Sequence, residues 1–71
     1  MNKVNPKALL NSKWTKVLVT NKEKHFIVVD VEFDEEQKVT LCVVEAVINH
    51  VQYEINWREL KEPNKRKIGW Q

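Results

Sequence analysis

The chain has 71 residues, a net charge of +2 at pH 7 and one cysteine, and 31% of its residues are charged. This length predicts one domain with one core, because a chain of this size buries only about 60% of the surface that its unfolded form exposes. One cysteine excludes an internal disulfide and is typical of a reducing compartment, so we predict a cytoplasmic location. The N-terminal residues contain no apolar signal region and no apolar run could span a bilayer, which argues against export and membrane insertion.

Three tryptophans, Trp14, Trp57 and Trp70, stand near the start, at the end of the clearest strand pattern and next to the last residue. A buried indole hides roughly 150–250 Å², which is a large share of the apolar area in a small domain. We expect these side chains to tie both ends of the chain to its middle, in one closed unit over residues 1–71. Alternatively, they form an exposed contact surface.

The first predicted element is a short helical turn over residues 6–10. Asn5 has the right position to cap it, and Pro6 occupies the first helical position, where its missing N–H is not needed. Leu9 and Leu10 are its apolar contribution. We therefore expect this turn to add apolar cover to a core made elsewhere.

Two strands are predicted next. Residues 14–20 are mostly β-branched or aromatic and favour a strand, and residues 21–24 form a polar turn. Apolar side chains then recur at every second position over residues 27–33, which is the pattern of a strand with one face on a core. The predicted core-facing side chains are Ile27, Val29, Val31 and Phe33.

A third and a fourth strand follow an acidic loop at residues 34–38. The third, residues 39–48, loses its alternation near Glu45, which indicates a bulge or burial on both faces. The dipeptide Asn49-His50 is a plausible two-residue turn, because asparagine tolerates positive φ. It leads into residues 51–57, which alternate as clearly as the second strand.

The C-terminal part begins with a second helical turn over residues 57–61. Asn56 and Glu59 have the spacing of a capping box, and Pro63 ends the turn. Residues 64–71 form a basic tail that could be flexible. Four consecutive strands with short polar turns predict a mainly β fold, either a curved four-stranded antiparallel meander or a small SH3-like barrel.

No group of side chains indicates catalysis, a metal or a cofactor. His25, His50 and Cys42 are the only soft metal ligands, and none has the paired spacing of a zinc site. Cys42 shares a strand face with apolar neighbours, as a small buried side chain would. The acidic loop lacks the spacing of a calcium loop, and Gly69 is the only glycine, so no phosphate-binding loop is present. We predict that the protein is not an enzyme and has no cofactor.

Charge is distributed unevenly along the chain. Residues 1–25 carry six lysines and one glutamate, residues 26–60 carry two basic and eight acidic residues, and residues 61–71 carry four basic and one acidic residue. The simpler interpretation is that the basic ends pair with the acidic middle and with solvent, each surface pair contributing little. The alternative is that both ends converge into one positive face for an anionic partner.

The candidate partner-binding residues are basic or aromatic, because rings interleaved with cations can stack bases and follow phosphates. They are Lys13, Trp14, Lys16, Trp57, Arg58, Lys61, Lys65, Arg66, Lys67 and Trp70. The alternative assigns Trp14 and Trp57 to the core and leaves the lysines as ordinary solubilising charge.

Arg58 distinguishes a structural from a functional role for this basic set, because it follows Trp57 directly and should point outward when the indole points inward. A structural arginine would pair with a strand carboxylate and its loss would lower stability. The available carboxylates are Glu32, Glu45 and Glu54. A functional arginine would change binding and leave stability intact.

Several short motifs occur together across nearly the whole chain. They are Asn5-Pro6-Lys7, Leu9-Leu10, Ser12-Lys13-Trp14-Thr15, Lys24-His25-Phe26, Trp57-Arg58-Glu59-Leu60-Lys61 and Gly69-Trp70. In this combination the chain resembles the small tryptophan-rich conserved hypothetical proteins of bacteria. The resemblance implies a family without an assigned activity, substrate or cofactor, so it supplies no catalytic residue.

The leading functional hypothesis is therefore a non-enzymatic binding module. One version binds RNA or single-stranded DNA through the basic, aromatic ends of the chain. The other is a protein-interaction or homo-oligomeric assembly subunit, since so short a chain has little material to cover both apolar faces of the third strand.

Overall fold

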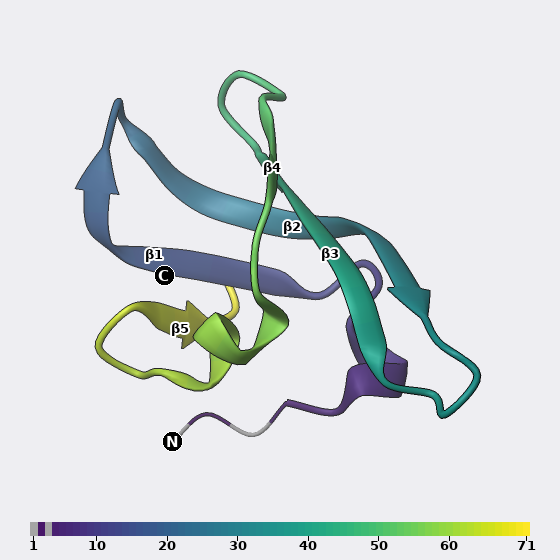
Figure 1. Ribbon diagram of the computed structural model, residues 1–71. Coiled ribbons are helices and arrows are strands. Elements are labelled where there is room, and N and C mark those ends of the chain that lie inside the picture. The colour runs from purple at the N-terminus through teal and green to yellow at the C-terminus, as the bar shows by residue number, and fades with distance from the viewer. Residues whose placement is uncertain (1, 3) are drawn as a thin grey trace.

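The computed structural model describes residues 2 and 4–71, which form one antiparallel sheet of five strands and two short 3-10 helices. In chain order the elements are η1 (Pro6–Ala8), β1 (Lys13–Thr20), β2 (Glu23–Phe33), β3 (Val39–Ala46), β4 (Gln52–Glu54), η2 (Trp57–Lys61) and β5 (Arg66–Ile68). The strands lie in the order β4-β3-β2-β1-β5, so the last strand returns to the first (Figure 1). The prediction of a mainly β fold is confirmed.

The fifth strand is the main difference from the predicted four-stranded meander. β5 lies within the segment predicted as a basic tail and pairs antiparallel with β1, with Trp14 opposite Ile68 and Lys16 opposite Arg66. Three residues are too short to show an alternation, and such a strand forms because β1 offers it a partner. Four strands was therefore the wrong number. Pairing of the described strands ends at β4 and β5, so the sheet is open and not a closed barrel.

A tight hairpin joins β1 to β2. Asn21 and Lys22 have positive φ angles of 53° and 62°, and the pair Thr20 and Glu23 closes the turn. Two positive φ angles in a two-residue turn match the right-handed twist of the flanking strands. The turn is thus shorter than the predicted residues 21–24, and Glu23 belongs to the sheet.

A bulge in β2 changes which side chains reach the core. The pairing with β3 shifts register between Val28 and Asp30, which leaves Val29 as an extra residue. Phe26 and Val28 are buried before the bulge, and Val31 packs against the core after it.

The predicted core face of the second strand was therefore right only at Val31. Ile27 and Val29 are half-buried and lie outside the core cluster, and Phe33 is exposed. The apolar run over residues 26–29 fits either face of a strand, so the sequence alone could not show where the bulge shifts the alternation.

The hairpin of β3 and β4 has a longer loop than predicted. β3 ends at Ala46, whose N–H donates to the carbonyl of Val51, and residues 47–51 connect it to β4. His50 has the positive φ of 61°, and the side chain of Asn49 accepts a hydrogen bond from the N–H of Val51 at 3.0 Å. The predicted two-residue turn and the longer third and fourth strands were wrong, because the asparagine side chain closes a wider turn.

Both predicted helical turns are present as 3-10 helices, but the first is shorter than the predicted residues 6–10, and Leu9 is buried while Leu10 is exposed. Asn5 and Asn56 cap the two helices, each side-chain oxygen accepting a backbone N–H of the first turn, at 3.0 and 3.1 Å. The second half of the predicted capping box is absent, because the carboxylate of Glu59 contacts Arg66 instead. In the part of the chain that the structure describes, no helix is long and apolar enough to cross a membrane.

The core lies inside the curl of the sheet (Figure 1). Its buried apolar residues are Leu9, Trp14, Phe26, Val28, Cys42, Val44, Ala46 and Leu60. Burial of Cys42 was predicted and is confirmed, and burial raises the pKa of its thiol. Asn2 fastens the N-terminal segment by donating from its amide to the carbonyls of Leu60 and Arg66, at 3.0 and 2.7 Å.

Candidate functional site

The ten predicted partner-binding residues do not form one surface. Trp14 is a core residue, 4% exposed, whose indole N–H donates to Ser12 Oγ at 2.9 Å. Arg66 is also buried, at 7% exposure. The others are exposed or half-exposed and fall into separate groups around Trp70 and Trp57.

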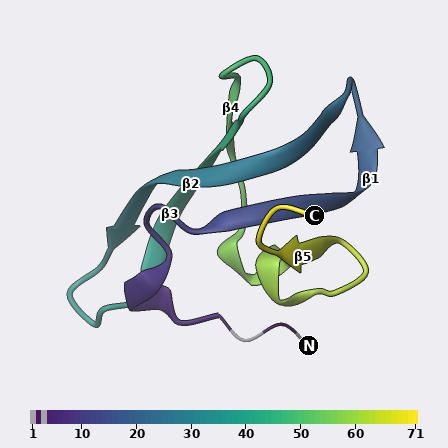
Figure 2. The same cartoon turned by 180° about the vertical axis from the view of Figure 1, so that it is seen from behind.

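The C-terminal residues fold back over the outer face of the sheet. Gly69 has a φ of +75°, a conformation that suits glycine, and it reverses the chain after β5. The hydroxyl of Thr15 donates to the carbonyl of Gly69 at 2.6 Å and accepts from the N–H of Gln71 at 2.9 Å. The indole N–H of Trp70 donates to the carbonyl of Phe26 at 3.0 Å. Seen from behind, the segment lies over β1 (Figure 2).

Trp70 is the centre of a small group that we call the outer-face cluster, made of Lys13, His25 and Trp70. The Nζ of Lys13 lies 4.8 Å from the centroid of the indole, within the range of a cation–π interaction. The imidazole of His25 lies 5.8 Å from the indole, centroid to centroid, and its Nε2 is 3.0 Å from the carbonyl oxygen of Gln71. The indole itself stays 43% exposed, so it offers a fixed and accessible aromatic surface.

A groove of about 440 Å³ borders the outer-face cluster, and three lysines line it. We call it the lysine groove. Its lining residues are Thr15, Lys16, Val17, Val19, Lys24, Lys67 and Gln71, and none of them has a carboxylate side chain. Thr15 stands opposite both His25 and Lys67 in the sheet, so groove and cluster are continuous.

A second group surrounds Trp57. Its indole packs against the core, and the Nζ of Lys61 lies 4.5 Å from the ring centroid. Trp57 and Arg58 border a pocket of about 540 Å³ that also contains Glu54, so the charge here is mixed. Among the described residues Arg58 forms no ion pair, and none of its three expected partners holds it.

Glu45, one of those expected partners, is engaged elsewhere. Its carboxylate accepts from the amide of Gln52 at 3.1 Å and lies 3.3 Å from Nδ1 of His50. The hydrogen bond from Gln52 has the larger effect and the one with His50 the smaller, and both lower the pKa of Glu45.

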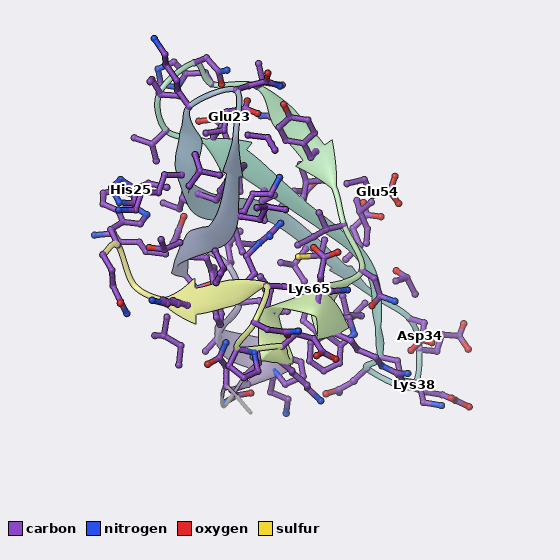
Figure 3. All side chains as sticks on the ribbon, turned by 90° about the vertical axis from the view of Figure 1, so that its left-hand side faces the viewer. Glu23, His25, Asp34, Lys38, Glu54 and Lys65 are labelled. Carbon is purple, nitrogen blue, oxygen red and sulfur yellow. The ribbon has the colours of Figure 1, made fainter. Side chains whose placement is uncertain are left out.

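Among the described residues, few ion pairs join the basic ends of the chain to its acidic middle. The described residues form three ion pairs, of which only Arg66 with Glu59, at 3.2 Å, joins a basic end to the middle. Figure 3 shows His25 at one side of the molecule and Glu54 and Asp34 at the other. Glu54 and Asp34 thus lie away from the outer-face cluster.

Sequence reasoning missed the burial of two charged residues and the position of His25. Glu23 and Arg66 are 4% and 7% exposed, and nothing in a polar turn or a basic tail indicates burial. Burial lowers the pKa of Arg66 and Glu59 opposes that shift. His25 is half-buried, and its place beside Trp70 depends on the strand β5, which the sequence did not predict. Within residues 2 and 4–71 no three metal-ligating side chains converge.

A family model described as a tryptophan-rich protein, DUF2389, matches residues 12–71. The chain belongs to the DUF2389 family. The predicted resemblance is thereby confirmed, and the function of DUF2389 proteins is unknown. The match includes all five strands and the three tryptophans of this DUF2389 protein and begins after η1. No curated protein and no solved structure matches the chain.

Proposed function

We propose that this protein is a non-enzymatic module that binds single-stranded nucleic acid on its outer face. The observation that carries the proposal is the lysine groove, lined by three lysines and no carboxylate side chain, beside the exposed indole of Trp70. Lysines that bind phosphates release the counterions condensed on the nucleic acid. A base stacked on an aromatic ring contributes about 1–3 kcal/mol. The free thiol of Cys42 supports a cytoplasmic setting.

The outer-face cluster is organised before any partner arrives. The hydrogen bond from Trp70 to the carbonyl of Phe26 restrains the indole, and Lys13 stands over the ring. A base that stacks on a fixed ring does not have to order it, which lowers the entropic cost of binding.

The finer part of the predicted fold belongs to the same proposal. Four strands in succession, the turn of η2 and a fifth strand that returns to β1 support an open form of the SH3-like barrel. The first half of β2 pairs with β1, and most of its length pairs with β3. One long curved strand therefore joins the two halves of the sheet.

The test is fluorescence anisotropy with labelled single-stranded RNA and DNA of mixed sequence, about 12 nucleotides long. The logarithm of the binding constant Kobs should fall linearly with the logarithm of the salt concentration. Replacing two groove lysines, Lys24→Gln with Lys67→Gln, should reduce the slope by about 1.4, since each lost phosphate contact accounts for about 0.7.

The matched control removes two lysines elsewhere, Lys7→Gln with Lys38→Gln. Both are exposed and lie outside the groove, and Figure 3 shows Lys38 far from His25. This control should keep the wild-type slope. No binding at low salt, binding that ignores salt, or equal slopes in the two double variants would refute the proposal.

Self-association is a second candidate, favoured by one apolar stretch. Val17, Leu18 and Val19 are consecutive exposed residues at the end of β1, beyond the residues that pair with β5. The N–H of Val17 donates to the carbonyl of Lys65 at 3.0 Å, and the exposed apolar side chains of this strand end are a surface on which a second chain can pack. Light scattering should then show a dimer that Leu18→Lys dissociates, and a monomer at millimolar concentration would exclude it.

A further inference from the structure

We infer that the inner face of the sheet holds a second binding site, a pocket for a small zwitterion of the amino-acid type. The pocket has a volume of about 310 Å³. Small-molecule sites begin at about 300 Å³, so this pocket suits a ligand as small as an amino acid. Its lining includes Lys16, Glu23, Phe26, Tyr53, Ile55 and Arg66.

Glu23 forms the negative end of the pocket. Its carboxylate oxygens accept from the hydroxyl of Tyr53, at 2.9 Å each, and from the amide of Asn49 at 2.9 Å. These neutral donors orient the carboxylate, yet among residues 2 and 4–71 no cation pairs with it. A buried carboxylate ordinarily has a cationic partner, so this one is suited to a ligand ammonium.

Arg66 forms the positive end together with Lys16, which borders both this pocket and the lysine groove. The guanidinium of Arg66 contacts Glu59 at 3.2 Å and donates to the carbonyl of Lys65 at 3.3 Å. Its Nε is buried and has no hydrogen-bond partner in the described part of the chain. Lys16 stands directly opposite Arg66 in the sheet. The Nζ of Lys16 donates to the hydroxyl of Thr20 at 3.1 Å, and no carboxylate among the described residues pairs with it, so the pocket can accept a ligand carboxylate at this end.

Aromatic rings lie in the same lining as the two charged ends. The rings of Phe26 and Tyr53 meet edge to face, with centroids 6.3 Å apart, and the guanidinium of Arg66 lies 5.6 Å from the centroid of Phe26. Glu23 and Arg66 line one pocket but do not pair with each other in the structure. An amino acid would place its ammonium at Glu23, its carboxylate at Arg66 and an apolar side chain against the rings.

The experiment is a ¹H–¹⁵N chemical-shift titration with each of the twenty free L-amino acids, up to about 10 mM, which detects dissociation constants in the millimolar range. At least one amino acid should give saturable shifts at Phe26, Tyr53 and the Nε–H of Arg66. Its N-acetyl and α-amide derivatives each lack one charge and should bind about tenfold more weakly, a difference of about 1.4 kcal/mol.

Glu23→Gln keeps an acceptor for Tyr53 and should weaken the amino acid about tenfold without weakening its N-acetyl derivative. Glu32→Gln, an exposed residue outside the pocket, is the matched control and should bind as the wild type does. If Glu23→Gln does not fold, the two blocked derivatives on the wild-type protein decide the question. No saturable shift with any amino acid, or equal binding of the N-acetyl derivative, would overturn the inference.

Discussion

Tyr53 and Glu23, thirty positions apart in the chain, form a hydrogen bond that holds the proton on the phenol of Tyr53. The hydroxyl of Tyr53 donates to both carboxylate oxygens, and ionisation of the phenol would remove that proton and place a second negative charge beside the first. The hydrogen bond to Glu23 therefore raises the pKa of Tyr53 above its ordinary value of 10.0. A raised pKa stabilises the fold below the ordinary value, and the contribution is lost as the pH rises through the folded-state pKa.

Tyr53 is the only tyrosine, so its titration can be followed directly by tyrosinate absorbance. The midpoint in the folded wild type should lie above 10.0. In Glu23→Gln the acceptor is neutral, and the midpoint should fall back toward the ordinary value. Identical midpoints in the two proteins would show that Tyr53 does not contact Glu23 in solution.

Short elements in this fold are held by a few tertiary contacts. A 3-10 helix of five residues has little stability of its own, and η2 is anchored by Leu60, the one buried side chain that it contributes. The final turn likewise depends on Gly69, whose positive φ carries Trp70 back over β1. Loss of either anchor should be felt beyond the element itself.

Leu60→Ala should lower the free energy of unfolding by about 2–5 kcal/mol, because a fully buried leucine leaves a cavity. Leu18→Ala is the matched control, since Leu18 is 76% exposed where Leu60 is 0% exposed. The control should change the unfolding free energy by less than about 0.5 kcal/mol. Urea denaturation measures both, and equal effects would contradict the position of η2.

Gly69→Ala should cost about 1–2 kcal/mol of unfolding free energy, since an L side chain is strained at positive φ. An added Cβ would meet nothing within 4 Å, so the cost comes from the backbone alone. Urea denaturation measures the cost, and the indole signal of Trp70 should shift in the same variant. An unchanged stability would mean that the chain leaves β5 in another conformation.

Features set by neighbouring residues could be predicted from the sequence, and features set by distant residues could not. The caps at Asn5 and Asn56 were predictable because capping involves residues two or three positions away. The bulge at Val29 and the strand β5 depend on partners elsewhere in the sheet, which no local pattern specifies. The burial of Glu23 has the same cause, since Tyr53 holds it from β4.

At the scale of the whole molecule, the return of β5 to β1 brings the two basic ends of the chain together. Lys13 comes from one end, and Lys67 and Trp70 come from the other, and all three lie on the outer face. Part of the candidate surface was thus predictable from the charge pattern. The rest was not, because no local pattern separates a core tryptophan such as Trp14 from the exposed Trp70.

The most direct test follows the three indole N–H signals during titration with single-stranded RNA at low and moderate salt. Trp70 is exposed beside the lysine groove, so its signal should shift at low salt and shift less as salt rises. The buried indole of Trp14 and that of Trp57, which packs against the core in a separate group, should stay in place. Shifts at Trp57 without Trp70, or no shift at any indole, would contradict a nucleic-acid surface on the outer face.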